Sequence, residues 1–173
     1  MGKTLIKVGK WDRLFWNGER HLLSNGQWLI HYDPQKFTIT DKGLAALVLN
    51  GGIKSFTYHE GSIESEKTPD LTAVIPKEQP KFKVEQTGIA KYTIGYDLGK
   101  DRRFNLEFVN VGEGTAFSVY LQAAYADILL TFGAPLFCDG PENAVVAWGD
   151  DHCLGVVMPI RIKMDKIAKP WNE

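Results

Sequence analysis

Helical patterns are rare in this chain, and their scarcity constrains its fold more than any other feature. Apolar residues recur at helical spacing in a short stretch after Asp41 and in a longer one at 116–132. Gly, Pro, Asn and Asp divide most of the remainder into segments of strand length. Because two helices cannot cover both faces of a parallel sheet, the sequence predicts an α+β fold built from antiparallel strands.

The first part of the chain has the pattern of a β meander. Strand-like segments lie at 13–16, 20–23 and 27–32. Asn17-Gly18 and Asn25-Gly26 favour the positive φ angles of type I′ hairpin turns. We therefore expect a three-stranded meander within residues 1–34, ending at Asp33-Pro34.

Both helices have start or stop signals. Thr40 or Asp41 can cap the short helix, and Asn50-Gly51-Gly52 can end it. The longer helix is expected over 116–132, where six apolar residues form one stripe, and Gly133 can supply its left-handed end.

The other segments are expected to be strands. They lie at 53–59, 63–67, 82–86, 90–96, 103–111, 136–138, 144–148 and 153–163. Residues 68–80 contain three prolines and should form an extended crossover.

Composition argues against several classes of protein. The length of 173 residues fits one domain, and the net charge of −1 gives no overall electrostatic case for nucleic-acid binding. Cys138 and Cys153 suggest two buried thiols, with a single bridge between neighbouring strands as the alternative. No signal peptide or membrane-spanning run is evident, so we expect a cytoplasmic protein with no membrane partner.

Patterns for catalysis are weak. The histidines are not at helical metal-binding spacing, and Gly112-Glu113-Gly114 lacks the Lys of a phosphate loop. Asp150-Asp151-His152 beside Cys153 leaves a small hydrolase open, although charged residues are common at the tips of turns. We expect no enzyme activity, no cofactor and no metal site.

Tryptophans suggest a second alternative. Trp28 and Trp148 fall within expected strands and should be core residues. Trp11 and Trp16 flank the first turn and are either core residues or an aromatic surface for a sugar, base or peptide. Together with Trp28 they leave open a β-rich ligand-binding module.

Two segments are more specific. Gly155-Val156-Val157-Met158-Pro159-Ile160-Arg161-Ile162 resembles the closing strand of the bacterial DNA polymerase sliding clamp (the β subunit), which ends in a similar Val-Met-Pro-Met-Arg-Leu run. Thr68-Pro69-Asp70-Leu71-Thr72-Ala73-Val74-Ile75-Pro76-Lys77 is similar to the clamp's aromatic-Pro-Asp-Tyr-x-x-Val-Ile-Pro signature. Between them, a helix with Tyr120-Leu121 near its start and three following strands match the order in the family's last domain. The similarity covers residues 68–163.

The resemblance implies a clamp-like α+β domain of antiparallel sheets with two helices at 35–163, after the meander at 1–34 and before a tail at 164–173. It implies a DNA replication accessory protein, of the kind a phage or mobile element could encode, that docks short linear motifs of DNA polymerase or other replication proteins. The implied peptide pocket is lined by Pro76, Val156, Met158, Pro159, Ile160 and Arg161. A proline cannot donate to a strand ladder and Met is adaptable, so such a run suits a peptide groove.

Three features differ from the family. Clamps carry several such domains per chain and close into a ring around DNA, so this chain would need more copies in a homo-oligomer. The expected helix at 116–132 has no Lys or Arg, and the short one has only Lys42, so no DNA-binding residues are assigned. The tail at 164–173 continues past the proline run, and Ile167 or Trp171 either occupies the pocket or belongs to a frayed terminus.

Overall fold

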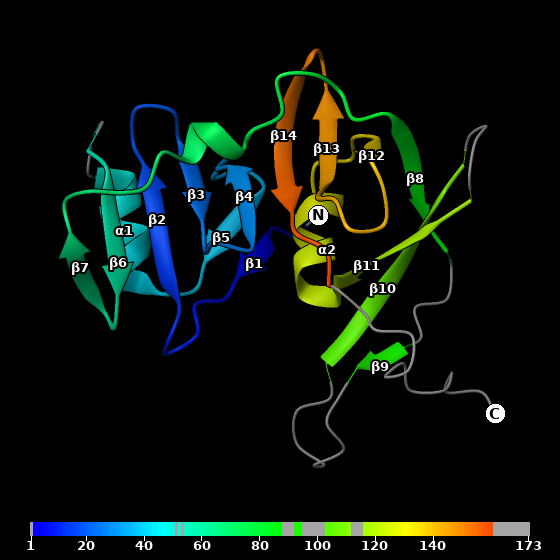
Figure 1. Cartoon of the computed structure of the whole chain (residues 1–173). Helices are drawn as coiled ribbons and strands as arrows, with labels where there is room; N and C mark the ends of the chain where they lie inside the picture. Colours follow the sequence, from blue (N-terminus) through cyan, green and yellow to red (C-terminus); the bar gives the residue numbers. More distant parts are fainter. Residues whose placement is uncertain are drawn as a thin grey trace.

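The computed structural model describes residues 2–50, 52, 54–87, 92–94, 103–111 and 116–160. Within them lie one antiparallel sheet of twelve strands, a two-stranded parallel sheet and the helices α1 (Lys42–Asn50) and α2 (Ala123–Leu130). The predicted α+β fold with mostly antiparallel strands is confirmed (Figure 1).

The large sheet runs in spatial order through β11 (Ser118–Gln122), β10 (Arg103–Asn110), β8 (Phe82–Gln86), β12 (Leu136–Cys138), β13 (Val145–Gly149), β14 (His152–Val157), β4 (Trp28–His31), β3 (Leu22–Ser24), β2 (Arg13–Asn17), β6 (Phe56–His59) and β7 (Ser62–Ser65). β9 (Tyr92–Ile94) pairs with β10 beside this path. The parallel sheet joins β1 (Thr4–Ile6) to β5 (Phe37–Ile39).

The topology contains a repeat. β2, β3 and β4 form a meander, α1 follows, and then β6 returns to pair with β2 and is joined by β7. β8, β10 and β11 form a second meander, α2 follows, and β12 returns to pair with β8 and is joined by β13. β14 has no counterpart in the first unit. It pairs with β13 on one side and β4 on the other, and Figure 1 shows it between the two units.

The helices and the crossover between the units cover opposite faces of the sheet. Neighbouring strand residues point alternately to the helices and to the crossover, as in the pairs Leu23 and Leu22, Ile30 and Leu29, and Val157 and Val156. The crossover contains the short 3-10 helix η1 (Leu71–Val74), which begins where the Asp70 carboxylate accepts a hydrogen bond from the Thr72 amide. The core therefore lies mainly under the helices, and two smaller clusters lie under the crossover.

Several expected elements are confirmed. The meander is present, and it belongs to the large sheet because β2 pairs with β6 and β4 with β14. Asp41 caps α1 by accepting a hydrogen bond from the Leu44 amide at 3.0 Å. Cys138 and Cys153 are buried free thiols, and burial raises the pKa of Cys153 to about 11. Residues 53, 90–91, 95–96 and 161–163 of the expected strands lie outside the described residues.

The expected type I′ turns at the two Asn-Gly dipeptides are wrong. In the first hairpin the positive φ belongs to His21 (54°), because the loop is longer than two residues. In the second hairpin the positive φ belongs to Gly26 (91°) alone. The Asn25 side chain accepts hydrogen bonds from the backbone amides of Gln27 and Trp28, and these bonds fix a different turn. Two consecutive positive φ angles, as a type I′ turn requires, occur instead at Glu60 and Gly61 (49° and 83°).

The expected helix over 116–132 is too long. Ser118–Gln122 forms β11, and α2 begins at Ala123. Val119 and Leu121 are buried at strand spacing and pair with Phe108 and Leu106 of β10. The apolar stripe of this segment fits both the helical and the strand period, and pairing with the preceding strand β10 decides for a strand.

Candidate functional site

The two segments that resemble the clamp family lie on the same face of the sheet. Val156 of β14 is buried with Val146 and Cys153, and Ile75 of the crossover packs against this cluster. Pro76 follows Ile75 and is half-buried. The structure thus brings Ile75, the neighbour of Pro76, against Val156, although they are distant in the sequence.

The proline run lies beyond the last strand. β14 ends at Val157, and Met158, Pro159 and Ile160 continue from it. The Met158 amide donates to the Gln27 carbonyl at 2.8 Å, and the Ile160 amide donates to the Tyr120 carbonyl at 2.8 Å. Pro159, which has no amide hydrogen, stands between these two donors.

This arrangement differs from the expected strand over 153–163. β14 is an interior strand of the sheet, and the proline terminates it because the ladder cannot continue through a residue without an N–H. Ile160 is held to β11, whereas Val156 faces the crossover. Arg161 and the tail at 164–173 lie outside the described residues.

A tryptophan lies next to Val156, although the sequence did not predict it as part of the peptide pocket. Trp148 of β13 is half-buried, pairs with Cys153 and packs beside Val146 and Val156. It was expected to be core, and only the pairing of β13 with β14 reveals its place. We call the face formed by Ile75, Pro76, Trp148, Val156 and Met158 the seam surface, since it lies where β14 joins the two units.

The seam surface is apolar and elongated. Met158 is 49% exposed, and Val74 on the adjoining crossover is 60% exposed. Cys153, opposite Trp148, precedes Met158 by five residues, so Trp148 and Met158 stand roughly 16 Å apart along β14 at the usual rise of a strand, with Val156 buried against Ile75 between them. An extended peptide of a few residues matches this length.

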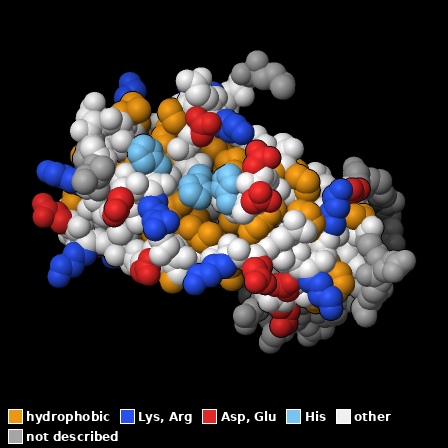
Figure 2. Space-filling view, turned by 90° about the horizontal axis from the view of Figure 1, so that it is seen from above, with side chains coloured by type: hydrophobic (Ala, Val, Ile, Leu, Met, Phe, Trp, Pro, Cys, Tyr) orange, Lys and Arg blue, Asp and Glu red, His pale blue; other side chains and the backbone are white. Residues whose placement is uncertain are grey.

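Histidines gather at one end of the sheet, where Figure 2 shows them among apolar and acidic side chains. The rings of His31 and His152 lie 6.1 Å apart, edge to face. Burial, and then the charge of His152, lower the pKa of His31. Asp150 and Asp151 form the adjoining turn, with φ angles of 50° and 72°. Within the described part of the chain, no group of three or more His, Cys, Asp or Glu side chains could hold a metal ion.

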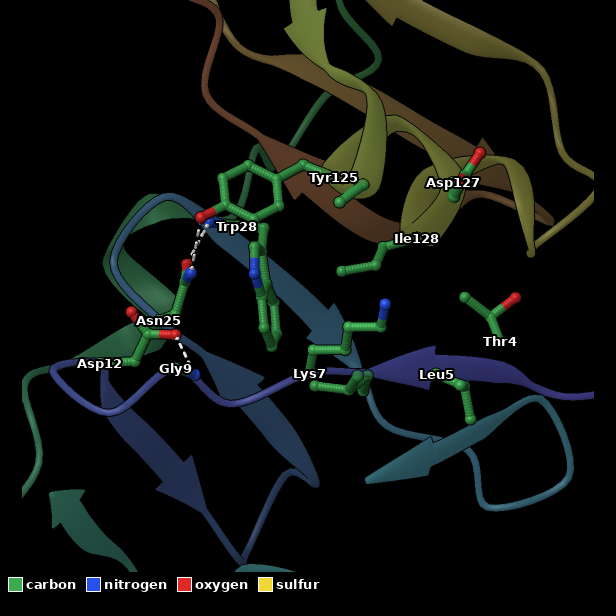
Figure 3. Close-up of a pocket in the computed structure, with 12 residues that line it drawn as sticks. Thr4, Leu5, Lys7, Gly9, Asp12, Asn25, Trp28, Tyr125, Asp127 and Ile128 are labelled. Carbon is green, nitrogen blue, oxygen red and sulfur yellow. Dashed lines mark hydrogen bonds between the residues drawn. The ribbon is translucent and has the colours of Figure 1, made fainter. Parts of the chain in front are cut away.

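A cavity of about 410 Å³ lies on the helix side, between β1, the turn from β3 to β4, and α2 (Figure 3). The side-chain amide of Asn25 donates a hydrogen bond to the Tyr125 hydroxyl at 3.3 Å, and this bond crosses one wall of the cavity. Trp28 is buried and lines the cavity, while Trp16 is core and Trp11 is 71% exposed. The three tryptophans therefore do not share one surface. The expectation of a core position is confirmed for Trp16 and Trp28 and is wrong for Trp11.

No helix in the described residues is both long and apolar enough to cross a bilayer. No protein-family model, curated protein or solved structure matches this chain. Its function therefore has to be inferred from its own residues and their geometry.

Proposed function

We propose that the protein is a clamp-like DNA replication accessory protein whose seam surface docks short peptide motifs of replication proteins. The observation that most supports this is the meeting of the two clamp-like segments at one seam. Ile75 packs against Val146, Cys153 and Val156 on the second unit, and also against the cluster of Leu22, Leu29 and Leu71 on the first.

The chemistry of the seam surface suits peptide docking. Met158 and Trp148 offer flexible and aromatic apolar area at its two ends, and Pro159 ends the β14 ladder next to Met158. Burying two apolar anchors of a peptide would contribute roughly 3–6 kcal/mol before the cost of ordering the peptide. We therefore expect micromolar affinity at best.

The topological repeat supports a further part of the proposal, namely assembly of several copies. β14 joins two like units edge to edge, so the sheet order ends in two unlike strands, β7 and β11. Unlike ends allow head-to-tail association, which forms a ring if the rotation between copies closes. Such a ring would supply the domains that clamps carry in one chain and would give DNA a place to pass. The other form of the proposal is an adaptor that docks peptides at the seam surface and does not encircle DNA.

The peptide proposal is tested by titrating a fluorescently labelled clamp-binding peptide. Met158→Asp should weaken binding at least about tenfold, because a charged group would replace an apolar contact. Leu49→Asp makes the same chemical change at a 66% exposed apolar residue of α1, on the opposite face, and should leave the affinity unchanged. Equal affinities for wild type and Met158→Asp would contradict peptide docking at the seam.

A further inference from the structure

The first residues of the chain combine exposed cations with an exposed aromatic ring. Lys3, Lys7 and Lys10 are exposed, and residues 2–11 contain no Asp or Glu. In and beside β1, Thr4 and Ile6 turn inward, whereas Lys3, Leu5 and Lys7 turn outward, as strand alternation requires. Lys3 and Lys7 therefore flank β1, and Lys10 follows in the loop that leads to Trp11.

Trp11 is the exposed ring. It is 71% exposed, whereas the other tryptophans that the structure describes are buried or half-buried. The Lys10 ammonium lies 5.1 Å from the centre of its ring. Trp11 therefore presents an open aromatic face to solvent beside a cation.

The loop that carries Trp11 is well ordered by its own hydrogen bonds. The Gly9 amide donates to the Asp12 carboxylate at 2.7 Å, and the Asp12 amide donates back to the Gly9 carbonyl at 3.1 Å. A Cβ at residue 9 would approach that carboxylate to 2.9 Å, so the Asp12 side chain would have to shift to admit a larger residue. The bond from Gly9 thus engages one oxygen of the Asp12 carboxylate with the backbone.

We infer that residues 3–11 form a contact surface for single-stranded nucleic acid, with Trp11 stacking on a base and Lys3, Lys7 and Lys10 facing phosphates. Aromatic rings interleaved with cations are the usual means of binding single strands, since every base has a face that can stack. A duplex keeps its bases stacked inside and cannot use Trp11 in this way. This surface is separate from the seam surface and does not depend on peptide docking.

Neighbouring charges predict a modest affinity. Lys7 shares the walls of the 410 Å³ cavity with Asp12 and with Asp127 of α2, and Lys10 shares a smaller cavity with Asp41 and Glu60. Three lysines would release few counterions, so the slope of log K against log salt should be only about −2. Binding should therefore be measured at low ionic strength.

The test is fluorescence anisotropy of a short labelled oligothymidylate. Trp11→Ala should weaken binding about fivefold or more, which is the size of one base-stacking contact. Lys7→Glu with Lys10→Glu should abolish it. Lys67→Glu with Lys77→Glu changes the net charge equally but acts on two exposed crossover lysines, and it should bind almost as the wild type does.

The outcomes separate this surface from its alternatives. Absence of wild-type binding, full binding by Trp11→Ala, or equal loss in both double variants would overturn the inference. Equal binding of a duplex would do so too, because it would show attraction to phosphates alone. So would binding to phosphatidylserine vesicles without binding to the oligonucleotide. Met158→Asp should bind the oligonucleotide normally, which keeps this result independent of the peptide proposal.

Discussion

Gly155 shows how closely the last strand approaches helix α2. A Cβ at this position would lie 2.9 Å from the Phe132 ring and 3.4 Å from side-chain carbons of Ile30 and Leu129. Any side chain here would push β14 away from the helix, since a packed core has no room to absorb it. Gly155 falls inside an expected strand, where glycine is typical of a close approach of two backbones. Only the fold shows that β14 makes this approach to α2.

His31 is the residue at which stability should respond to pH. Burial lowers its pKa below the ordinary value of 6.5, so the unfolded chain binds the proton more readily than the folded protein does. The free energy of unfolding should therefore fall as pH decreases through 6.5, until the folded pKa is passed. Asp150, Asp151 and Arg20 lie near the pair. A hydrogen bond with the Arg20 backbone raises the pKa of His31 and partly offsets the lowering, whereas the charge of Arg20 lowers it.

Urea unfolding at several pH values checks this prediction. His31→Gln should flatten the dependence below pH 6.5, because it removes the group that is protonated on unfolding. His21→Asn changes a histidine outside the pair and should keep the slope. An unchanged slope in His31→Gln would show that other groups cause the dependence.

Among the elements, the crossover is the one whose role depends most on tertiary packing. Its prolines predicted an extended connection, and the structure adds η1, which fixes Leu71 against Leu22 and Leu29. The sequence could predict these local elements because turn residues and caps act on near neighbours. It could not place the boundary between β11 and α2 or bring Trp148 to the seam, because both depend on strand pairing.

Leu71 should hold the crossover on the sheet. It is 5% exposed, so Leu71→Ala should reduce the free energy of unfolding by about 2–3 kcal/mol through lost apolar contacts and a small cavity. Val74→Ala, in the same turn but 60% exposed, should change it by less than about 0.5 kcal/mol. Chemical denaturation of both variants measures the difference. Similar values for the two would mean that η1 contributes little to stability.

At the scale of the whole molecule, the repeat of two units is the feature that the sequence did not reveal. The units share strand order but no visible identity, and the meander at 1–34 was treated as separate from the residues that follow. Different side chains can satisfy one topology as long as apolar positions face the same side. That Pro76 and Val156 act together stays a prediction of the resemblance to the clamp family. The sequence did not indicate the cavity beside α2, because its walls come from residues that the fold alone brings together.

Head-to-tail assembly is the prediction that belongs to the whole molecule. β7 ends the sheet order, and its Ile63 is 43% exposed. If β7 meets β11 of the next copy, Ile63→Lys should disrupt the contact, since an exposed lysine on an edge strand opposes pairing. The edge at β11 is partly occupied already, because the Tyr120 carbonyl accepts the Ile160 amide, so assembly should be concentration-dependent.

Sedimentation velocity over a range of protein concentrations measures this. The wild type should form a closed oligomer of more than two copies, Ile63→Lys should remain monomeric, and Leu49→Lys on α1 should assemble normally. A two-fold dimer would indicate like edges in contact, which contradicts the head-to-tail arrangement. A wild type that stays monomeric would leave the seam surface as an adaptor for single peptides, because encirclement of DNA requires several copies whereas docking requires only one.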